Sequence, residues 1–363
     1  MISCRGLTFL LVALLAHVRL ARTFPIWSSQ TNHRNYRHRS TFPASTVQTS
    51  SALSSQQDFN PPDNHDKDAQ EQDNVPHLTV VIPAFNEEFR ILETLESYQN
   101  YLASSDRWKD KTSILVVDDG STDGMVDVVR HFGNSVESIS ANTDPNHRVS
   151  IECLSLDTNQ GKGAALARGI QEACERYPTG LILTTDADGS ADVSGLEDLY
   201  YSLISVLRDS VSGGGDRGSN ATMMIQWDQA AMINGYRTYE STSASRLIFR
   251  WGFRTVVKSI CGNLSVKDSQ CGFKLMTASA GASLYLNLHV QGWSHDVEVL
   301  YRARLLGILV SEQSICWEDK MGSKLVASPG GILAVCLQMF WQVVRIRFCY
   351  ATGRWRLEDR DET

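Results

Sequence analysis

Several features that mark well-known protein classes are missing from this 363-residue chain. Its eight cysteines include no C-x-x-C pair, which excludes a zinc ribbon and a small disulfide-stapled scaffold. The G-x-x-x-x-G-K-[ST] pattern of a P-loop does not occur. Basic residues are not in excess, since 34 Lys and Arg stand against 41 Asp and Glu. Nucleic acid is therefore not expected as the main partner.

The first 57 residues contain six arginines and no acidic residue, which leaves −7 − 6 = −13 on the rest of the chain. An apolar run over residues 6–16 is shorter than the roughly 20 residues that a membrane span needs. We interpret residues 1–21 as a signal or short membrane anchor and residues 22–76 as a disordered linker. A retained anchor predicts that the main domain faces the cytosol. Alternatively, residues 22–57 are a transit segment that directs the protein to a plastid or another organelle.

Strand and helix patterns alternate from residue 78 onward. Continuous apolar runs predict strands buried on both faces, and apolar spacings of three and four predict amphipathic helices between them. The expected strands cover residues 78–83, 113–118, 149–156, 181–185 and 230–235, and the expected helices include residues 91–104, 164–176 and 243–260. Repeated strand-then-helix units predict an α/β fold with a doubly wound, mostly parallel sheet, whose ligands bind at the strands' carboxyl ends.

Acidic residues gather where two of these strands end. Asp118 and Asp119 close one apolar run, and Asp186 and Asp188 follow another, directly before a glycine. Because the carboxyl ends of parallel strands share one sheet edge, we expect the four side chains on the same edge. Paired carboxylates suit Mg²⁺ or Mn²⁺ carrying a diphosphate, so Asp186 and Asp188 are candidate metal ligands. Taken alone, Asp-Gly would indicate only a turn.

Two basic segments leave alternatives open. In Asn159-Gln-Gly-Lys-Gly163, backbone N–H groups and Lys162 could lie near an anion, or the glycines could simply allow a tight turn. The helix over residues 243–260 interleaves basic residues, among them Arg246, with aromatic ones. That pattern fits contact with an acidic lipid surface, an approach to phosphates, or one solvated face of a packed helix.

Residues 329–356 form a last amphipathic segment, which a polar tail over residues 357–363 follows. Two glutamines and two arginines interrupt its apolar run, which argues against a membrane-spanning helix. We expect a helix at the membrane interface, with Phe340 and Trp341 toward lipid and the arginines away from it. Core packing explains the same spacing almost as well.

The motifs together resemble a known family. Val81-Ile-Pro-Ala-Phe-Asn-Glu-Glu88, Val116-Val-Asp-Asp-Gly-Ser-Thr-Asp123, Asn159-Gln-Gly-Lys-Gly163 and Asp186-Ala-Asp188 resemble the nucleotide-sugar half of the inverting family 2 glycosyltransferases with the GT-A fold. Asp268-Ser-Gln-Cys-Gly-Phe-Lys-Leu275, Trp293-Ser-His-Asp-Val-Glu298 and Trp317-Glu-Asp-Lys-Met-Gly-Ser-Lys-Leu325 resemble dolichyl-phosphate β-glucosyltransferases. Residues 345–355 resemble their closing segment. The resemblance covers about residues 78–355 and implies a GT-A domain over residues 77–328.

This resemblance implies a role for each matching position. The donor nucleotide sugar would contact Pro83, Phe85, Glu87, Asp118, Asp119, Lys162 and Asp186. The catalytic group would comprise Asp188, Asp296, Arg237 and Lys324, with Asp186 and Asp188 as ligands of Mg²⁺ or Mn²⁺. The acceptor would contact Arg246, Gln270, Lys274 and Ser323.

The implied reaction moves glucose from UDP-glucose to dolichyl phosphate in the endoplasmic reticulum membrane, supplying lipid-linked oligosaccharide assembly for N-glycosylation. A phosphate monoester has its second pKa near 6, so its oxygen is largely anionic at neutral pH and needs no strong general base. We therefore expect Asp296 to position groups rather than take a proton; the alternative is a solvated acid at a helix start. Cys271 has no placed His or Asn partner, so we interpret it as packing.

Two other readings stay open. One is a family 2 enzyme that uses another donor, such as GDP-mannose, on the same lipid. The other is a nucleotide-sugar binding protein without turnover, against which the intact Asp186, Asp188 and Lys324 argue.

Overall fold

The computed structural model describes residues 75–143, 149–212, 225–238, 244–264, 266–318, 320 and 331–357. The expectations for residues 1–21, and for the linker as far as residue 74, lie outside these ranges. So do Ser323 and Lys324, as well as the polar tail beyond residue 357.

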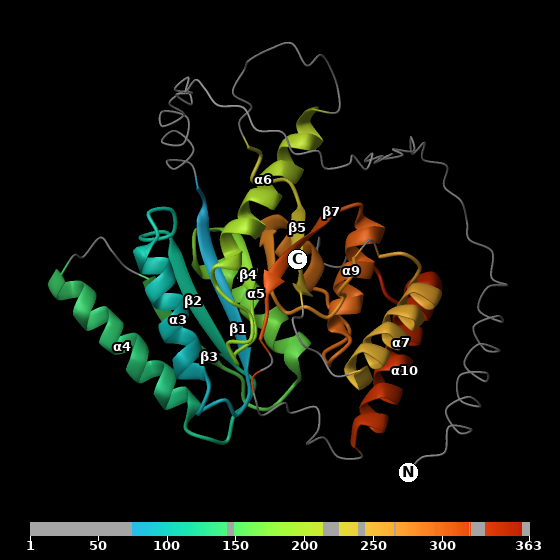
Figure 1. Ribbon diagram of the computed structural model, residues 1–363, viewed down its shortest axis with the longest axis horizontal. Coiled ribbons are helices and arrows are strands. Elements are labelled where there is room, and N and C mark those ends of the chain that lie inside the picture. Colours follow the sequence, from blue (N-terminus) through green and yellow to red (C-terminus); the bar gives the residue numbers. More distant parts are fainter. Residues whose placement is uncertain are drawn as a thin grey trace, which may run out of the picture. The chain divides into compact units, whose positions relative to one another are not determined.

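Seven strands in the described ranges form one sheet with the order β3-β2-β1-β4-β6-β5-β7 (Figure 1). They are β1 (His77–Ala84), β2 (Thr112–Asp118), β3 (Val149–Ser155), β4 (Thr179–Thr184), β5 (Ala231–Thr238), β6 (Lys274–Thr277) and β7 (Leu309–Cys316). Only β6 among them runs antiparallel to its neighbours β4 and β5. The expected doubly wound, mostly parallel α/β sheet is confirmed.

The central strands are apolar throughout because both faces of the sheet are covered. Leu78, Val80 and Ile82 of β1 point into one core, whereas Val81 points into the other. All four side chains are fully buried, and each such burial contributes about 1.5–3 kcal/mol. This explains why β1 shows a continuous apolar run rather than alternation.

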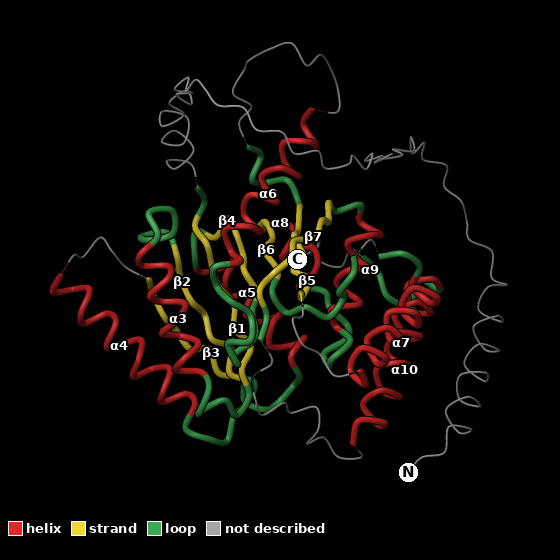
Figure 2. The backbone as a smooth tube through the Cα atoms, in the orientation of Figure 1, coloured by secondary structure: helices red, strands yellow, loops and turns green. Residues whose placement is uncertain are grey.

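Helices form a layer on each face of the sheet (Figure 2). The core that contains Leu78 lies under α3 (Ile91–Ser104), α4 (Met125–Thr143) and α6 (Gly195–Ser212). The core that contains Val81 lies under α5 (Lys162–Arg176), α8 (Ala278–Tyr285) and α9 (His295–Leu306), with α7 (Ala244–Cys261) and α10 (Gly331–Ala351) packed beyond them. Helices α7 and α10 contact each other.

Helix α10 differs from its expected orientation. Val335, Met339, Val343 and Ile346 form a buried stripe that packs toward α7 and α9. The opposite stripe carries Arg345 beside Trp341, which is 65% exposed, so basic and aromatic groups are not segregated as expected. The reason is that the protein core takes one whole side of the helix. Within the described part of the chain, no helix is both long and apolar enough to cross a bilayer.

Candidate active site

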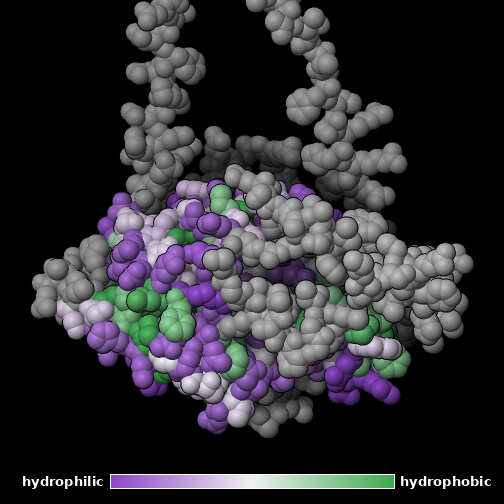
Figure 3. Space-filling view, turned by 60° about the horizontal axis from the view of Figure 1, so that its bottom comes forward, coloured by the Kyte–Doolittle hydropathy of each residue, from purple (hydrophilic) through white to green (hydrophobic). Residues whose placement is uncertain are grey.

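The acidic ends of β2 and β4 lie at the same edge of the sheet. Asp118 is the last residue of β2 and stands opposite Ala84, the last residue of the parallel strand β1. Strand β4 also runs parallel to β1 and ends at Thr184, two residues before Asp186. Figure 3 shows the molecule turned so that this edge comes forward, and both hydrophilic and apolar side chains lie on the face in view. The fold therefore brings together the two acidic motifs that stand almost 70 residues apart in sequence.

Asp119 binds the backbone of the glycine-rich segment before α5. Its Oδ1 accepts a hydrogen bond from Gln160 N at 2.7 Å, and its Oδ2 accepts one from Gly161 N at 2.8 Å. Burial raises the pKa of Asp119, and these two donors oppose that effect. The expected anion contact and the expected tight turn are both present. The backbone N–H groups bind an anion, but it is the protein's own Asp119 carboxylate. Gly161 has a φ of 102°, a conformation that favours glycine.

Asp118 fixes the turn that follows β2. Its Oδ1 accepts a hydrogen bond from Ser121 N at 2.8 Å, and its side chain is almost fully buried. On β1, Pro83 is buried and Phe85 is half-buried beyond the strand's end. Asp118, Pro83 and Phe85 thus lie at the carboxyl ends of β2 and β1, where the donor's nucleoside is predicted to bind. Their contact with the nucleoside stays a prediction.

Glu87 forms a two-point ion pair with Arg90 at the start of α3. Arg90 donates through Nε and Nη2 to the two carboxylate oxygens, each at 2.7 Å. Its Nη1 also lies 3.8 Å from Oδ2 of Asp188. Sequence reasoning missed Arg90, although it lies only two residues after the Asn86-Glu-Glu88 motif. The arginine links the predicted nucleoside site to the predicted metal site.

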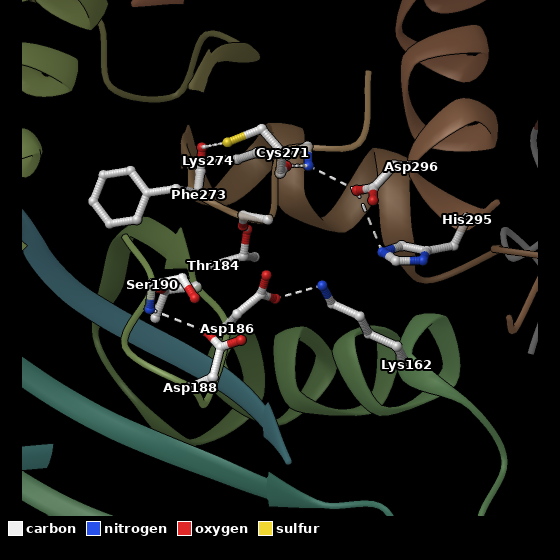
Figure 4. A network of polar contacts seen from close by, with 12 residues as sticks. Lys162, Thr184, Asp186, Asp188, Ser190, Cys271, Phe273, Lys274, His295 and Asp296 are labelled. Carbon is white, nitrogen blue, oxygen red and sulfur yellow. Dashed lines mark hydrogen bonds and ion pairs between the residues drawn. The ribbon is translucent and has the colours of Figure 1, made fainter. Parts of the chain in front are cut away.

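Asp186 and Asp188 face different partners in the site (Figure 4). Lys162, the first residue of α5, forms an ion pair with Oδ1 of Asp186. Burial would raise the pKa of Asp186, but the Lys162 ammonium outweighs this and holds the pKa below its ordinary value. Asp188 Oδ1 accepts a hydrogen bond from Ser190 N at 3.0 Å. The two side chains are 38% and 28% exposed, so both carboxylates are accessible to a ligand.

The loop over residues 270–273, which belongs to the acceptor half of the domain (residues 265–328), lies against Asp186. Thr184 Oγ1 donates a hydrogen bond to the carbonyl oxygen of Gly272 at 2.8 Å. A Cβ atom at Gly272 would lie 2.6 Å from Oδ1 of Asp186. The loop can approach the carboxylate this closely only because residue 272 has no side chain.

Asp296 and Lys274 form a buried ion pair beside this loop (Figure 4). Lys274 Nζ lies 2.7 Å from Oδ1 of Asp296 and also donates to the carbonyl oxygen of Cys271. Burial would raise the pKa of Asp296, yet His295, Lys274 and Lys162 together lower it to about 2. Asp296 is only 4% exposed, so the alternative of a solvated helix-start acid is wrong.

His295 is a second residue that the sequence did not predict. Its Nδ1 lies 2.9 Å from the carbonyl oxygen of Gly292, which can only accept, so Nδ1 carries a proton. Its Nε2 lies 3.3 Å from Oδ1 of Asp296. Burial lowers the pKa of His295. The only available signal was its position beside Asp296 in the Trp293–Glu298 motif.

Arg237 and Gln270 both contact Asp268. Arg237 makes a two-point ion pair, with Nε 2.7 Å from Oδ2 and Nη2 3.0 Å from Oδ1. The backbone N–H of Gln270 donates to Oδ1 at 3.4 Å. Arg237 also lies over the ring of Trp317, 5.3 Å from its centre. Arg237 therefore stands at the carboxyl end of β5 with its guanidinium already bound on one side.

Two further predictions concern single residues. Burial raises the pKa of Cys271 to about 11, which fits a packing role rather than a nucleophile. Arg246 belongs to α7, but its side chain lies outside the described part of the chain.

The described residues contain no cluster of three or more His, Cys, Asp or Glu side chains with the geometry of a metal site. Asp186 and Asp188 nevertheless fit a hard divalent cation, because they offer accessible carboxylate oxygens two residues apart. Mg²⁺ is commonly held by one or two carboxylates plus waters and substrate phosphates, so two protein ligands are sufficient.

Fold and site together define the class of protein. A mostly parallel sheet presents paired carboxylates and several cations at its carboxyl edge, as nucleotide-sugar transfer requires. Residues 79–264 match the family described as Glycosyl transferase family 2. The structure is that of a GT-A-like glycosyltransferase.

Similar proteins of known class show which group of glycosyltransferases the chain belongs to. The chain is 31% identical over 291 residues to the dolichyl-phosphate beta-glucosyltransferase of Dictyostelium discoideum, covering 79% of this chain and 78% of the relative. The Homo sapiens enzyme of the same name is also 31% identical over 291 residues, covering 77% and 78%. Among solved structures, glucosyl-3-phosphoglycerate synthase from Mycobacterium tuberculosis in complex with UDP is 15% identical, with a TM-score of 0.47 and coverage of 80% and 87%. The chain belongs to the dolichyl-phosphate beta-glucosyltransferases of glycosyl transferase family 2.

Proposed function

We propose that the protein transfers glucose from UDP-glucose to dolichyl phosphate, giving dolichyl β-glucosyl phosphate and UDP. The product would supply lipid-linked oligosaccharide assembly in N-glycosylation. Family membership supports this reaction, since the similarity to dolichyl-phosphate beta-glucosyltransferases covers about four fifths of the chain. It extends beyond residues 79–264, into the half that we assign to the acceptor.

The buried ion pair between Asp296 and Lys274, with the low pKa of Asp296, is the structural observation that carries the proposal. A transferase that acts on a sugar hydroxyl needs a base whose pKa lies near the working pH. Asp296 has a pKa of about 2 and is ion-paired with the buried Lys274, so it is poorly suited to take a proton. A phosphate acceptor needs no such base, because it is already largely ionised at neutral pH. The geometry therefore favours a phosphate over a hydroxyl as the acceptor group.

Asp186 and Asp188 would hold Mg²⁺ or Mn²⁺ at the donor's diphosphate. A bound divalent ion supplies charge neutralisation for the leaving UDP. The chain's own cations would then reduce the repulsion between the diphosphate and the incoming acceptor phosphate. Lys162 and Arg90 lie beside these carboxylates and could serve this role, and Arg237 and Lys324 are predicted to join them.

We also propose that the enzyme works at the cytosolic face of the endoplasmic reticulum membrane. A polyprenol phosphate keeps its lipid tail in the bilayer, so the site must be held close to the membrane surface. The exposed stripe of α10, with Trp341 and Arg345, supports such contact. An organelle reached through a transit segment is the alternative location.

The donor assay tests the proposal directly. The purified full-length protein, given dolichyl phosphate in membranes, Mg²⁺ and labelled nucleotide sugars, is expected to form a glucosylated lipid phosphate from UDP-glucose alone. Asp188→Asn should abolish transfer while its circular dichroism spectrum stays unchanged. Turnover of GDP-mannose at an equal or higher rate would reject the donor. UDP-glucose binding without any product would indicate a non-catalytic binding protein instead.

A further inference from the structure

Each of the two carboxylates that follow β4 is faced by a cation from the start of a different helix. Lys162 opens α5 and forms an ion pair with Asp186. Arg90 occupies the position just before the first residue of α3, and its guanidinium lies 3.8 Å from Oδ2 of Asp188. The two predicted metal ligands therefore already have counter-ions supplied by the protein.

Both cations can change partner without disturbing the fold. Lys162 and Arg90 have side chains that are 23% and 21% exposed, so each reaches solvent at the site. The backbone beneath Lys162 is fixed independently, because Gly163 N donates to the carbonyl oxygen of Gln291 at 2.7 Å. Arg90 keeps Glu87 as a second anionic partner. Only the flexible ends of the two side chains would need to move.

We propose that Lys162 and Arg90 are exchangeable counter-ions, which a divalent cation displaces from Asp186 and Asp188 and which then bind the donor's diphosphate. This inference rests on the proposed function of the site. It adds that metal and nucleotide sugar bind cooperatively, and that the two cations weaken metal binding when no nucleotide is present.

Charge accounts for the cooperativity. Three carboxylates, Asp186, Asp188 and Glu87, face two cations, Lys162 and Arg90, giving a net charge of −1 at the site. A divalent ion alone would meet two like charges that have just lost partners, which opposes its binding. A diphosphate brings at least two negative charges and gives both cations new partners. By linkage, metal must then strengthen nucleotide binding by the same factor as nucleotide strengthens metal binding.

The test measures Mn²⁺ affinity, by the electron paramagnetic resonance signal of free Mn²⁺, with and without UDP. Lys162→Met is expected to bind Mn²⁺ alone about tenfold more tightly than wild type, and the strengthening by UDP should fall by about tenfold, within the usual range of coupling. Arg90→Met should change both values in the same directions. Lys162→Arg keeps the charge and should retain most of the coupling.

Two matched controls remove cations elsewhere. Lys109 pairs with Asp106 at the surface, and Arg176 pairs with Glu152 at the far end of α5, so Lys109→Met and Arg176→Met should leave both affinities unchanged. The proposal is overturned if Lys162→Met binds Mn²⁺ alone no more tightly than wild type. With glucosyl transfer by wild type intact, that result would leave the proposed function standing. Absence of both Mn²⁺ binding and transfer in wild type would reject the two together.

Discussion

At the scale of single residues, the carboxylate of Asp186 packs directly against the Cα atom of Gly272. A methyl group at that position would lie 2.6 Å from Oδ1 and 2.8 Å from Oδ2. Either the carboxylate or the loop from Gln270 to Phe273 would have to shift by several tenths of an ångström. Because Asp186 also pairs with Lys162, such a shift would alter two groups of the site at once.

Gly272→Ala should therefore weaken Mn²⁺ binding and glucosyl transfer by roughly 10–100-fold, the usual effect of disturbing a residue that supports a metal ligand. The fold should survive, because neighbouring strands β4 and β6 hold the surrounding backbone. Gly252→Ala is the matched control, since no atom lies within 4 Å of a Cβ placed there. Titration of Mn²⁺ together with the transfer assay measures the effect. Wild-type metal affinity in Gly272→Ala would contradict this account of the loop.

The site residues differ in how far the sequence could predict them. Asp118 and Asp186 follow apolar runs, and a parallel sheet brings such strand ends to one edge whatever the details of packing. Lys274 was predicted to contact the acceptor, yet its ammonium is buried and binds Asp296 and the carbonyl oxygen of Cys271. Arg90 and His295 show no periodic or spacing signal. Their importance comes from partners that only the folded chain brings within reach.

At the scale of secondary-structure elements, α9 and α10 are joined through a buried hydrogen-bond network. Glu298 is fully buried and accepts hydrogen bonds from Val290 N at 2.6 Å and from the hydroxyl of Tyr350 at 2.8 Å. That hydroxyl in turn accepts a hydrogen bond from the buried Arg302 at 3.0 Å. The loop held by Glu298 leads to Gln291, whose carbonyl oxygen binds the start of α5. The end of α10 thus supports the segment that carries Lys162.

Tyr350→Phe should lower the free energy of unfolding by about 1–3 kcal/mol, because it removes a partner from two buried charged groups. Urea denaturation followed by circular dichroism measures this as a lower midpoint. Tyr201→Phe provides a matched control: Tyr201 is 55% exposed, and its hydroxyl accepts a surface hydrogen bond from Arg107. The control should change stability by no more than about 0.5 kcal/mol. Equal effects of the two variants would show that the network contributes nothing specific.

The predicted strands and helices of the donor half begin and end within a few residues of the observed ones, whereas the acceptor half was predicted less fully. Strand β6 has four residues, which is too short for a clear pattern. Helix α9 is buried from His295 through Ala303, so it shows no amphipathic stripe. Strand β7 is only half-buried at the sheet's edge and mixes polar with apolar residues. A periodic apolar pattern identifies a helix or strand that buries one face and exposes the other to solvent. These three elements are too short, fully buried or irregularly exposed, so they show no such pattern.

At the scale of the whole molecule, two neighbouring helices carry an excess of basic charge, as residues 1–57 also do. Helix α7 carries four basic and no acidic residues, and residues 331–357 do the same. The remaining chain therefore holds −7 − 8 = −15. The right-hand part of Figure 3, where α7 and α10 lie, shows apolar and hydrophilic surface side by side. An anionic membrane would repel most of the protein and attract this region, which would orient the enzyme at the surface.

Removing two exposed cations from this region should weaken binding to anionic vesicles. Each Lys or Arg near a membrane surface contributes about 1 kcal/mol, so Arg345→Gln with Arg354→Gln should reduce the affinity for phosphatidylserine vesicles by roughly 30-fold at low salt. Arg130→Gln with Arg208→Gln changes the net charge equally on α4 and α6, which cover the opposite face of the sheet, and should have little effect. Vesicle sedimentation at increasing salt measures the difference, which should shrink as the charges are screened. If both double variants bind equally well, net charge rather than this region governs membrane contact, and the orientation inferred from α7 and α10 is wrong.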